Sequence, residues 1–246
     1  MFDLGLTIEC GQFFRYNKAD GGYFIYAGDR RLFVRQGDKP DGFWAHFFDL
    51  DRDYNVIYEK LAENDPIMQR AIDFAPGIRI MNQDPWETLV CFIISANNRI
   101  PMIKKTVENI VSIFGGGTNF PSPDVLSGAS PEELNACKTG FRSKYIIDAA
   151  KKFSLLSPQF TIPTPELRKL LTTIDGVGNK VADCVMLFSM GRREVFPVDV
   201  WIGRAMQVLY GVPPKETQVF AKEKFGEYAG YANQLLFHYA RMNRIV

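Results

Sequence analysis

The sequence predicts an α+β protein in which a small N-terminal antiparallel β-sheet domain is followed by a helical remainder. Two observations predict this fold class. Between Phe2 and about Leu50, aromatic and β-branched residues alternate with polar residues, as in strands. Beyond that point apolar residues recur every three or four positions, which is the period of an amphipathic helix. The predicted domains are a β-rich N-terminal domain, 1–76, which includes the first helical segment, and a helical domain, 77–246.

The strand-like segment contains its own turn signals. The run YFIYAGDRRLFVRQGD, residues 23–38, is interrupted at Ala27-Gly28-Asp29. Two more turns are marked by glycine-containing pairs, at 21–22 and 37–38. The predicted sheet ends near WAHFFDLDRDY, residues 44–54.

Seven helical segments are predicted in the remainder, in addition to the second helix of a hairpin described below. Asp84 is a candidate N-cap with Pro85 at the first helical position. The segment SPEELNACKTG begins with a capping pattern and is expected to end at Gly140. In chain order, the segments are 55–75, 84–96, 101–117, 130–140, 164–174, 199–211 and 231–243.

The composition excludes several classes of protein. The chain is 46% hydrophobic, which is enough to bury a sizeable core. Its four cysteines form neither a CxxC pair nor a cluster typical of zinc or iron–sulfur sites. No apolar run approaches the roughly 20 residues of a membrane helix, and no cationic, apolar leader is present. We therefore expect a reduced, cytoplasmic protein with no metal and no membrane role.

Charge is distributed unevenly along the chain. Residues 1–137 hold 13 Lys/Arg and 19 Asp/Glu, a net charge of −6, whereas residues 138–246 hold 16 and 9, a net charge of +7. A basic second half indicates a polyanionic partner such as nucleic acid, although a chance imbalance has the same appearance.

The stretch TTIDGVGNKVADCVM, residues 172–186, joins two predicted helices through the turn G-V-G. Gly176 and Gly178 allow a tight turn with accessible main-chain N–H groups, and the second helix adds its positive N-terminal end. Such a helix-hairpin-helix, at about 164–190, can hold a nucleic-acid backbone without reading its sequence. An ordinary tight connection has the same pattern, so this fragment alone leaves both interpretations open.

Lys180 lies just inside the second helix of this hairpin. A solvated side chain, a phosphate contact and a nucleophile are all open interpretations for it. Asp199, which follows 19 residues later, is a candidate N-cap of the next helix. The two also suit covalent catalysis, because a neutral amine can attack and a carboxylate can stabilise positive charge developing on a sugar.

Five short motifs around these residues are similar to those of one enzyme family. GQFFRY, FIISANNRI, GFRSKYI, GVGNKVADC and FPVDVW occur in the order seen in 8-oxoguanine DNA glycosylases of the helix-hairpin-helix-Gly/Pro-Asp superfamily. The resemblance spans nearly the whole chain, including the N-terminal sheet, and is closest to a compact bacterial or archaeal member. Because the last cysteine is Cys184, the C-terminal iron–sulfur loop of some relatives is excluded.

The resemblance implies a bifunctional glycosylase and lyase. Lys180 matches the lysine that attacks C1′ of the damaged nucleoside, forms a Schiff base and nicks the strand by β-elimination. Asp199 matches the aspartate that stabilises the oxocarbenium-like state. The target base must leave the stack, because C1′ is not reachable inside the duplex.

The resemblance also implies a pocket for the extruded base. Gly11 matches the glycine whose carbonyl accepts a hydrogen bond from N7–H of 8-oxoguanine, a group that guanine lacks. Cys184 and Phe237 match the pair that sandwiches the base, and Asn233 matches a glutamine that reads its pairing edge. From composition alone, Cys184 and Phe237 would be assigned to the core and Gly11 to a turn.

A further group of residues is assigned to duplex binding by the same resemblance. Asn97 matches the asparagine that fills the vacated space and pairs with the opposite cytosine, although an amide that caps a helix end is the alternative. Phe141 matches an aromatic wedge beside the opposite base, which without the resemblance would pass for a core residue. The remaining DNA-contacting positions are Met102, Arg142, Gly176, Gly178 and Trp201.

The chain departs from the family pattern at four positions. Asn233 is one methylene shorter than the glutamine it replaces, and Trp201 replaces a histidine that contacts phosphate. Met102 replaces an arginine that contacts the opposite cytosine, and a thioether lacks those charged donors. Arg99 stands where a third asparagine is usual. We therefore predict weaker preference for cytosine opposite the lesion.

Two alternatives are weighed against this function. An alkylpurine DNA glycosylase commonly lacks the lysine, and a non-catalytic hairpin module has no need for Lys180 with Asp199. The expected partner is double-stranded DNA that contains 8-oxoguanine, bound by a monomer. No redox or nucleotide cofactor is implied, and a monovalent cation at the hairpin is left open.

Overall fold

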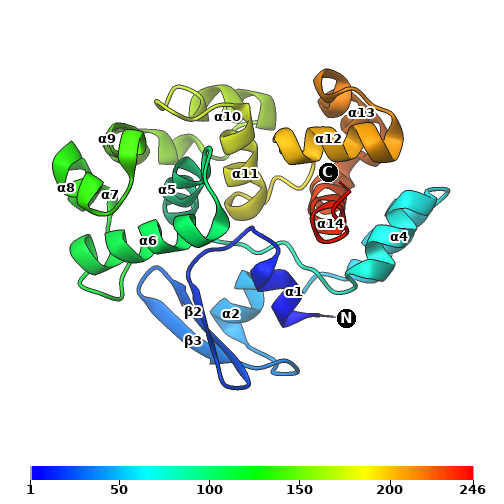
Figure 1. Ribbon diagram of the computed structural model, residues 1–246, viewed down its shortest axis with the longest axis horizontal. Coiled ribbons are helices and arrows are strands. Elements are labelled where there is room, and N and C mark those ends of the chain that lie inside the picture. The colour runs from blue at the N-terminus through cyan, green and yellow to red at the C-terminus, as the bar shows by residue number, and fades with distance from the viewer. Residues whose placement is uncertain (1, 246) are drawn as a thin grey trace. The chain divides into compact units, whose positions relative to one another are not determined.

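The computed structural model describes residues 2–245. Within this range it contains a three-stranded sheet, fourteen α-helices and four 3-10 helices (Figure 1). The strands are β1 Tyr16–Ala19, β2 Gly22–Ala27 and β3 Arg30–Val34. The α-helices are α1 Leu4–Glu9, α2 Gly42–Phe47, α3 Tyr54–Ala62, α4 Pro66–Phe74, α5 Pro85–Ser95, α6 Ile100–Phe114, α7 Pro123–Ser127, α8 Pro131–Ala136, α9 Ser143–Leu156, α10 Thr164–Leu171, α11 Asn179–Ser189, α12 Val200–Tyr210, α13 Thr217–Phe225 and α14 Ala229–Met242. The 3-10 helices are η1 Gly140–Arg142, η2 Ser157–Gln159, η3 Pro214–Glu216 and η4 Gly226–Tyr228.

The chain folds into two compact units, each built from separate stretches of sequence. Unit 1 comprises Met1–Gln12, Lys39–Asn82 and Met186–Val246, and unit 2 comprises Phe13–Asp38 and Gln83–Val185. The two units therefore do not follow the predicted division of the chain at residue 76. The sheet belongs to unit 2, together with the helices from α5 to the greater part of α11.

The antiparallel sheet is confirmed, but it is shorter than predicted. Its order is β1-β2-β3, with Tyr16 opposite Ile25 and Ile25 opposite Leu32. The predicted turns around Gly21 and Gly28 connect the strands, and both glycines have positive φ. The strand-like interpretation of the segments before and after the sheet is wrong, because α1 and α2 form there.

Local capping explains why helices form in that aromatic-rich sequence. Asp3 precedes α1, and its carboxylate accepts a hydrogen bond of 2.8 Å from the Leu6 main-chain N–H. This supplies one of the partners that the first turn of a helix lacks. Helix α1 then buries Leu4 and Ile8 on one face, a helical period that the aromatic alternation concealed.

The predicted helix at 55–75 is two helices. Asn64 has positive φ, and the Asp65 carboxylate caps α4 by accepting from Ile67 and Met68 N–H groups at 3.0 Å. Pro66 follows at the first position of α4, where a missing N–H is harmless. A second boundary also differs, since α8 ends at Ala136 and not at Gly140. The remaining predicted helices are present.

Unit 2 is organised around α5. This helix begins as predicted, with Asp84 accepting from Glu87 N–H at 2.9 Å, and it is buried from Trp86 to Ile94. It packs against α6 and α9. The buried Glu87 carboxylate pairs with Arg15 at 2.9 Å, which ties the segment before the sheet to the helical core.

Unit 1 is organised around α14, which packs against α4, α12 and α13. A polar network accompanies this apolar core. Asp49 accepts hydrogen bonds from Tyr54 and Arg52 at 3.0 Å, and the Arg79 guanidinium donates to the Asp49 carbonyl oxygen at 2.6 Å. Segments distant in the chain are thus joined by side-chain to main-chain bonds. Within residues 2–245, no helix combines the length and hydropathy of a membrane span.

Candidate active site and nucleic-acid interface

The helix-hairpin-helix predicted at 164–190 is present as α10, a turn and α11. Gly176 has a φ of +79°, and a Cβ placed there would lie 2.4 Å from the Tyr145 ring. Only glycine meets both constraints without strain. Gly178 is exposed, has ordinary φ and has open space where a Cβ would lie. Its carbonyl accepts the main-chain hydrogen bond from Ala182, which starts α11.

Helix α9 holds the hairpin turn in place. The Asp148 carboxylate accepts from the Asp175 N–H at 2.8 Å, and Lys152 donates to the Thr173 carbonyl at 2.7 Å. The two hairpin helices are joined by a partly buried ion pair, in which Arg168 Nε lies 2.6 Å from the buried Asp183 Oδ1. The turn is therefore fixed from outside as well as by its own glycines.

Lys180 is the second residue of α11 and is half-buried. Its Nζ lies 3.4 Å from Ser95 Oγ and 5.1 Å from the centroid of the Phe92 ring. Ser95 Oγ in turn donates to the Phe92 carbonyl at 2.7 Å, so the hydroxyl presents a lone pair to the amine. A freely solvated surface lysine does not fit this environment. The contact with Ser95 was not foreseen, although Ser95 stands inside the motif FIISANNRI.

Cys184 lies one helical turn beyond Lys180 on α11 and is buried. Its neighbours on the helix, including Asp183 and Val185, are also buried. The position suits both a core residue and the wall of a pocket. No group of three or more metal-ligating side chains occurs among the described residues.

Three of the residues assigned to the duplex, Asn97, Phe141 and Arg142, lie together in unit 2. Asn97 is exposed, has a φ of +51°, and lies in the loop between α5 and α6. Phe141 is 55% exposed in η1. Arg142 joins the two loops: its guanidinium donates to the carbonyls of Ala96 at 2.5 and 3.0 Å and of Asn97 at 3.1 Å.

Arg142 is itself buried, and its guanidinium carbon lies 4.3 Å from the Phe141 ring centroid. A further bond runs from Arg142 to the Thr139 carbonyl at 3.2 Å. Burial lowers the pKa of Arg142 from its usual value, which is far too high for the group to lose its charge at neutral pH. The side chain predicted to contact DNA is therefore occupied by main-chain carbonyls.

A shallow groove of about 690 Å³ lies beside Phe141. Lys138 and Lys144 line it, together with Gly140 and Ser143. Met102, on α6, is 44% exposed, and Arg99 is exposed at the N-cap position of the same helix. An exposed aromatic ring flanked by lysines suits a nucleic acid, whose bases can stack on the ring and whose phosphates can pair with the lysines.

In unit 1, Asp199 is the N-cap of α12, as predicted. Its Oδ1 accepts from the Ile202 N–H at 2.8 Å, and the side chain is half-buried. Val200 and Trp201 follow in the first turn and are 66% and 49% exposed. Two large apolar side chains in solvent next to a carboxylate indicate a surface that meets a partner.

The loop that leads to Asp199 is held by side chains of two helices, which donate hydrogen bonds to its main-chain carbonyls. Asn233 Nδ2, on α14, donates to the Pro197 carbonyl at 2.9 Å, and Gln218 Nε2, on α13, donates to the Phe196 carbonyl at 2.9 Å. The Gly230 N–H donates to the Arg193 carbonyl at 2.7 Å. Asn233 was assigned to the base pocket, yet its amide nitrogen is already engaged two residues before Asp199.

Gly11 lies in a turn with a φ of +93°, between the buried Cys10 and Gln12. The Gln12 amide donates to the Thr7 and Arg79 carbonyls at 3.0 and 2.7 Å and accepts from the Met81 N–H at 2.9 Å. These three hydrogen bonds of Gln12 fix the side of the turn that follows Gly11. Burial raises the pKa of the Cys10 thiol to about 11, so it remains protonated at neutral pH.

One face of α14 lies against this turn. Gln234 Nε2 donates to the Cys10 carbonyl at 3.2 Å and Arg241 to the Glu9 carbonyl at 3.4 Å. Phe237, half-buried, stands between these two donors at helical spacing, so it shares their face. Gln12 and Gln234 were not predicted from the sequence; a glutamine within an otherwise apolar segment was their only signal.

Family comparisons agree with this arrangement over most of the chain. Residues 36–89 match the model for the 8-oxoguanine DNA glycosylase N-terminal domain, and residues 90–229 match the HhH-GPD superfamily of base excision DNA repair proteins. The N-glycosylase/DNA lyase OGG1 of Arabidopsis thaliana is 30% identical over an alignment 281 residues long. The alignment covers 95% of this chain and 76% of that protein.

Two solved structures are similar over 99% of this chain and 93% of their own. MBOgg1, in complex with a low-affinity DNA ligand, is 44% identical with a TM-score of 0.91. The 8-oxoguanine glycosylase/lyase of Clostridium acetobutylicum, bound to double-stranded DNA with cytosine opposite 8-oxoguanine, is 36% identical with a TM-score of 0.90.

Proposed function

The chain belongs to the N-glycosylase/DNA lyase family within the HhH-GPD superfamily of base excision DNA repair proteins, and from that premise we propose that it excises 8-oxoguanine from duplex DNA. The observation that carries the proposal is the half-buried Lys180 amine in the first turn of α11, beside the hairpin turn. A helix start offers its positive end to a phosphate, and the amine adjoins it.

Lys180 acts as the nucleophile. Nζ forms a bond to C1′ while the glycosidic bond breaks. The base leaves with the electron pair of that bond and takes up a proton, which balances the proton that the attacking nitrogen gives up. The bond between C1′ and the ring oxygen of the sugar then breaks, the oxygen takes up a proton, and a Schiff base between Nζ and C1′ results. Removal of a proton from C2′ breaks the C3′–O bond, and the phosphate leaves with the electron pair. The Ser95 hydroxyl, 3.4 Å from Nζ, supports this role because it accepts a hydrogen bond from the amine and fixes its direction.

Asp199 stabilises the positive charge that develops on the sugar. Its Oδ1 is used to cap α12, which fixes the carboxylate and leaves its second oxygen for the substrate. Asn233 supports the same residue from a distance, because its bond to the Pro197 carbonyl holds the loop that ends at Asp199.

The extruded base is assigned to Gly11, Cys184, Phe237 and the side-chain oxygen of Asn233. Support comes from the residue before Gly11, since the Cys10 carbonyl accepts a hydrogen bond from Gln234, and from the half-buried Phe237 ring. A rigid main-chain acceptor rewards N7–H of 8-oxoguanine and repels the bare N7 of guanine.

Asn97 and Phe141 enter the duplex as one body. Arg142 contributes as a positioning residue, since it binds the Asn97 and Ala96 carbonyls while stacking on Phe141. With Arg142 engaged by main-chain carbonyls and Met102 at the place of the family arginine, neither position offers a free guanidinium to the opposite base. We therefore expect relaxed discrimination, which a panel of excision rates opposite C, A, G and T tests; a sharp preference for cytosine contradicts it.

Borohydride trapping on an 8-oxoguanine duplex tests the function as a whole. The wild-type protein and Lys151→Gln, an exposed lysine on α9, should both form a covalent adduct, whereas Lys180→Gln should form none. Base release without an adduct would indicate the hydrolytic chemistry of an alkylpurine glycosylase. Binding without release or adduct would indicate a non-catalytic hairpin module.

A further inference from the structure

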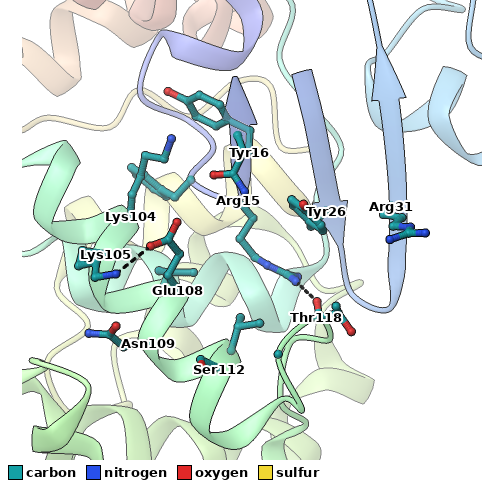
Figure 2. A pocket seen from close by; sticks show the side chains of 15 residues that line it. Arg15, Tyr16, Tyr26, Arg31, Lys104, Lys105, Glu108, Asn109, Ser112 and Thr118 are labelled. Atoms are coloured by element: carbon teal, nitrogen blue, oxygen red, sulfur yellow. Dashed lines mark hydrogen bonds and ion pairs between the residues drawn. The ribbon is translucent and has the colours of Figure 1, made fainter. Parts of the chain in front are cut away.

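A cavity of about 430 Å³ in unit 2 takes no part in the proposed excision reaction. Tyr16 and Asn17 of β1 and Tyr26 of β2 form one wall, and α6 forms the wall opposite, from Lys104 to Ser112 (Figure 2). Gly117 and Thr118 also line it, and Thr118 is drawn below Tyr26 in Figure 2. The volume falls within the range of about 300–1,000 Å³ that is usual for small-molecule sites.

The cavity is electropositive, although it lies in the acidic part of the sequence. Its lining side chains include four cations, Arg15, Arg31, Lys104 and Lys105, and one carboxylate, Glu108. Counting Glu87, which pairs with Arg15, the net charge is +2. A concave site lined by one sign of charge concentrates ligands of the opposite sign.

Arg15 forms a rigid floor. Its guanidinium pairs with Glu87 at 2.9 Å and donates to the carbonyls of Thr118 at 2.6 Å and Gly28 at 3.3 Å. Both partners of the ion pair are almost fully buried. Arg15 is therefore fixed in place and contributes to the shape and the electrostatic potential of the cavity. An anionic group of a ligand would be bound by the other three cations, Arg31, Lys104 and Lys105.

The two lysines of α6 are suited to that group. Lys105 pairs with Glu108 at 3.3 Å, but both side chains are more than half exposed, and such a pair contributes little and exchanges readily. Lys104 Nζ lies 3.5 Å from the centroid of the Tyr16 ring, which directs it along the cavity wall. Arg31 lies on β3 at the outer rim and is exposed.

The cavity is also suited to a flat, polar ring. On the sheet side, Tyr26 is half-buried and faces the cavity, with the Asn17 amide on the same wall. On the α6 side, the Asn109 amide and the Ser112 hydroxyl line it. Aromatic rings interleaved with cations and amides are typical of sites that bind nucleotides by stacking and charge.

We propose that this cavity binds a nucleoside monophosphate unit, with the phosphate at Lys104 and Lys105 and the base against Tyr26. The proposal goes beyond excision of the damaged base, since none of these residues is assigned to that reaction. A free nucleotide and a nucleotide within a DNA strand share this chemistry, and the experiment separates them.

Isothermal titration calorimetry of the full chain provides the test. The probes are dGMP, deoxyguanosine, inorganic phosphate and a short single-stranded oligonucleotide. We expect dGMP to bind at least tenfold more tightly than deoxyguanosine or phosphate alone. Lys104→Gln combined with Lys105→Gln should weaken dGMP binding at least tenfold, and Lys151→Gln on α9 should leave it unchanged. Tyr26→Leu should weaken dGMP but not phosphate, which separates stacking from charge.

Each outcome decides the proposal. If the oligonucleotide binds more tightly than dGMP and this binding is lost in the double lysine variant, the site binds a nucleotide within a DNA strand. If dGMP binds more tightly than the oligonucleotide, the site binds a free nucleotide. Excision from a saturating duplex should stay within about twofold in that variant, so failure of this site is distinct from failure of the active site. The proposal is overturned if no probe binds, if phosphate binds as tightly as dGMP, or if the double lysine variant and the control behave alike.

Discussion

The two units position their candidate residues by different means. In unit 2, the hairpin glycines, Lys180 and Asn97 stand at helix starts and turns that short stretches of sequence define. In unit 1, the surroundings of Gly11 and Asp199 depend on bonds between distant segments, such as Gln234 to Cys10 across 224 positions and Asn233 to Pro197 across 36. Motif reading therefore predicts where the site residues of unit 2 stand along the chain, although the side chain beside Lys180, Ser95, still comes from a segment 85 positions away.

Charge shows the same contrast once the chain is folded. Unit 2 holds 16 Lys/Arg and 13 Asp/Glu, a net charge of +3, and unit 1 holds 13 and 15, a net charge of −2. The sequence halves differ far more, at −6 and +7. Folding thus reduces the apparent asymmetry, yet the unit with the hairpin remains the basic one. Its attraction for DNA phosphates should fall as salt rises.

The largest expected effects are losses of excision rate on substitution of the proposed catalytic residue of each unit, Lys180 in unit 2 and Asp199 in unit 1. Lys180→Gln should abolish trapping and lower single-turnover excision by about 10³-fold or more, because the attacking amine is gone. Asp199→Asn should lower the rate by about 10²–10³-fold while keeping the melting temperature, because asparagine caps a helix as well as aspartate.

Melting curves and single-turnover rates for the two variants check this pair. If Asp199→Asn loses several degrees of melting temperature together with its activity, its role is mainly structural and the contrast between the units weakens.

The second effect concerns the buried ion pair of unit 2. Glu87→Gln should lower the free energy of unfolding by about 3–5 kcal/mol, because Arg15 is left charged and unpaired in the interior. The double variant Arg15→Met with Glu87→Leu should recover most of that loss. Urea denaturation of the wild type and both variants measures it, and a single variant as stable as the wild type would show that water or another group compensates Arg15.

A matched glycine pair tests the hairpin turn. Gly176→Ala should destabilise by about 2 kcal/mol or more, since a Cβ there meets Tyr145 and φ is positive. Gly178→Ala should stay within about 0.5 kcal/mol, because the space is open. Thermal unfolding compares them, and equal losses would contradict the close approach of Gly176 to Tyr145. A loss of duplex affinity in Gly178→Ala without a loss of stability would support a phosphate contact there.

The smallest effect is a pH dependence in unit 1. Burial, with a smaller contribution from Arg241, lowers the pKa of His238 from its ordinary value of 6.5. As pH falls below that value, the unfolded chain takes up a proton that the folded chain does not, so stability should fall. Urea denaturation at pH 7.5 and 5.5 should show a smaller decrease for His238→Asn than for the wild type. An identical decrease would assign the effect to other groups.

Much of the fold was predictable because its signals are local. The turns at Gly21 and Gly28, the caps at Asp84 and Ser130 and the hairpin glycines each act within a few residues, and all are present. The strand-like interpretation before Tyr16 failed because alternation of aromatic residues was weighed above the capping of α1 by Asp3. The break at Asp65-Pro66 is also a local signal, because Asp is a favoured N-cap and Pro a favoured first helical residue.

The site was predictable in its residues but not in their neighbours. The sequence singled out Lys180 and Arg142, yet the Ser95 hydroxyl beside one and the carbonyls of Ala96 and Asn97 beside the other came only from the structure. Hydrogen bonds between distant segments leave no periodic trace in the sequence, so no pattern can announce them.

By itself, the sequence determined the α+β class, most helix starts, the hairpin and the residues that resemble a lysine-dependent glycosylase. Only the tertiary structure decided that Arg142 serves the main chain, that Asn233 holds the Pro197 loop, and that four cations surround one cavity in an acidic stretch. The reason is physical: caps and turns depend on neighbours along the chain, whereas burial and charge clustering depend on which distant segments pack together.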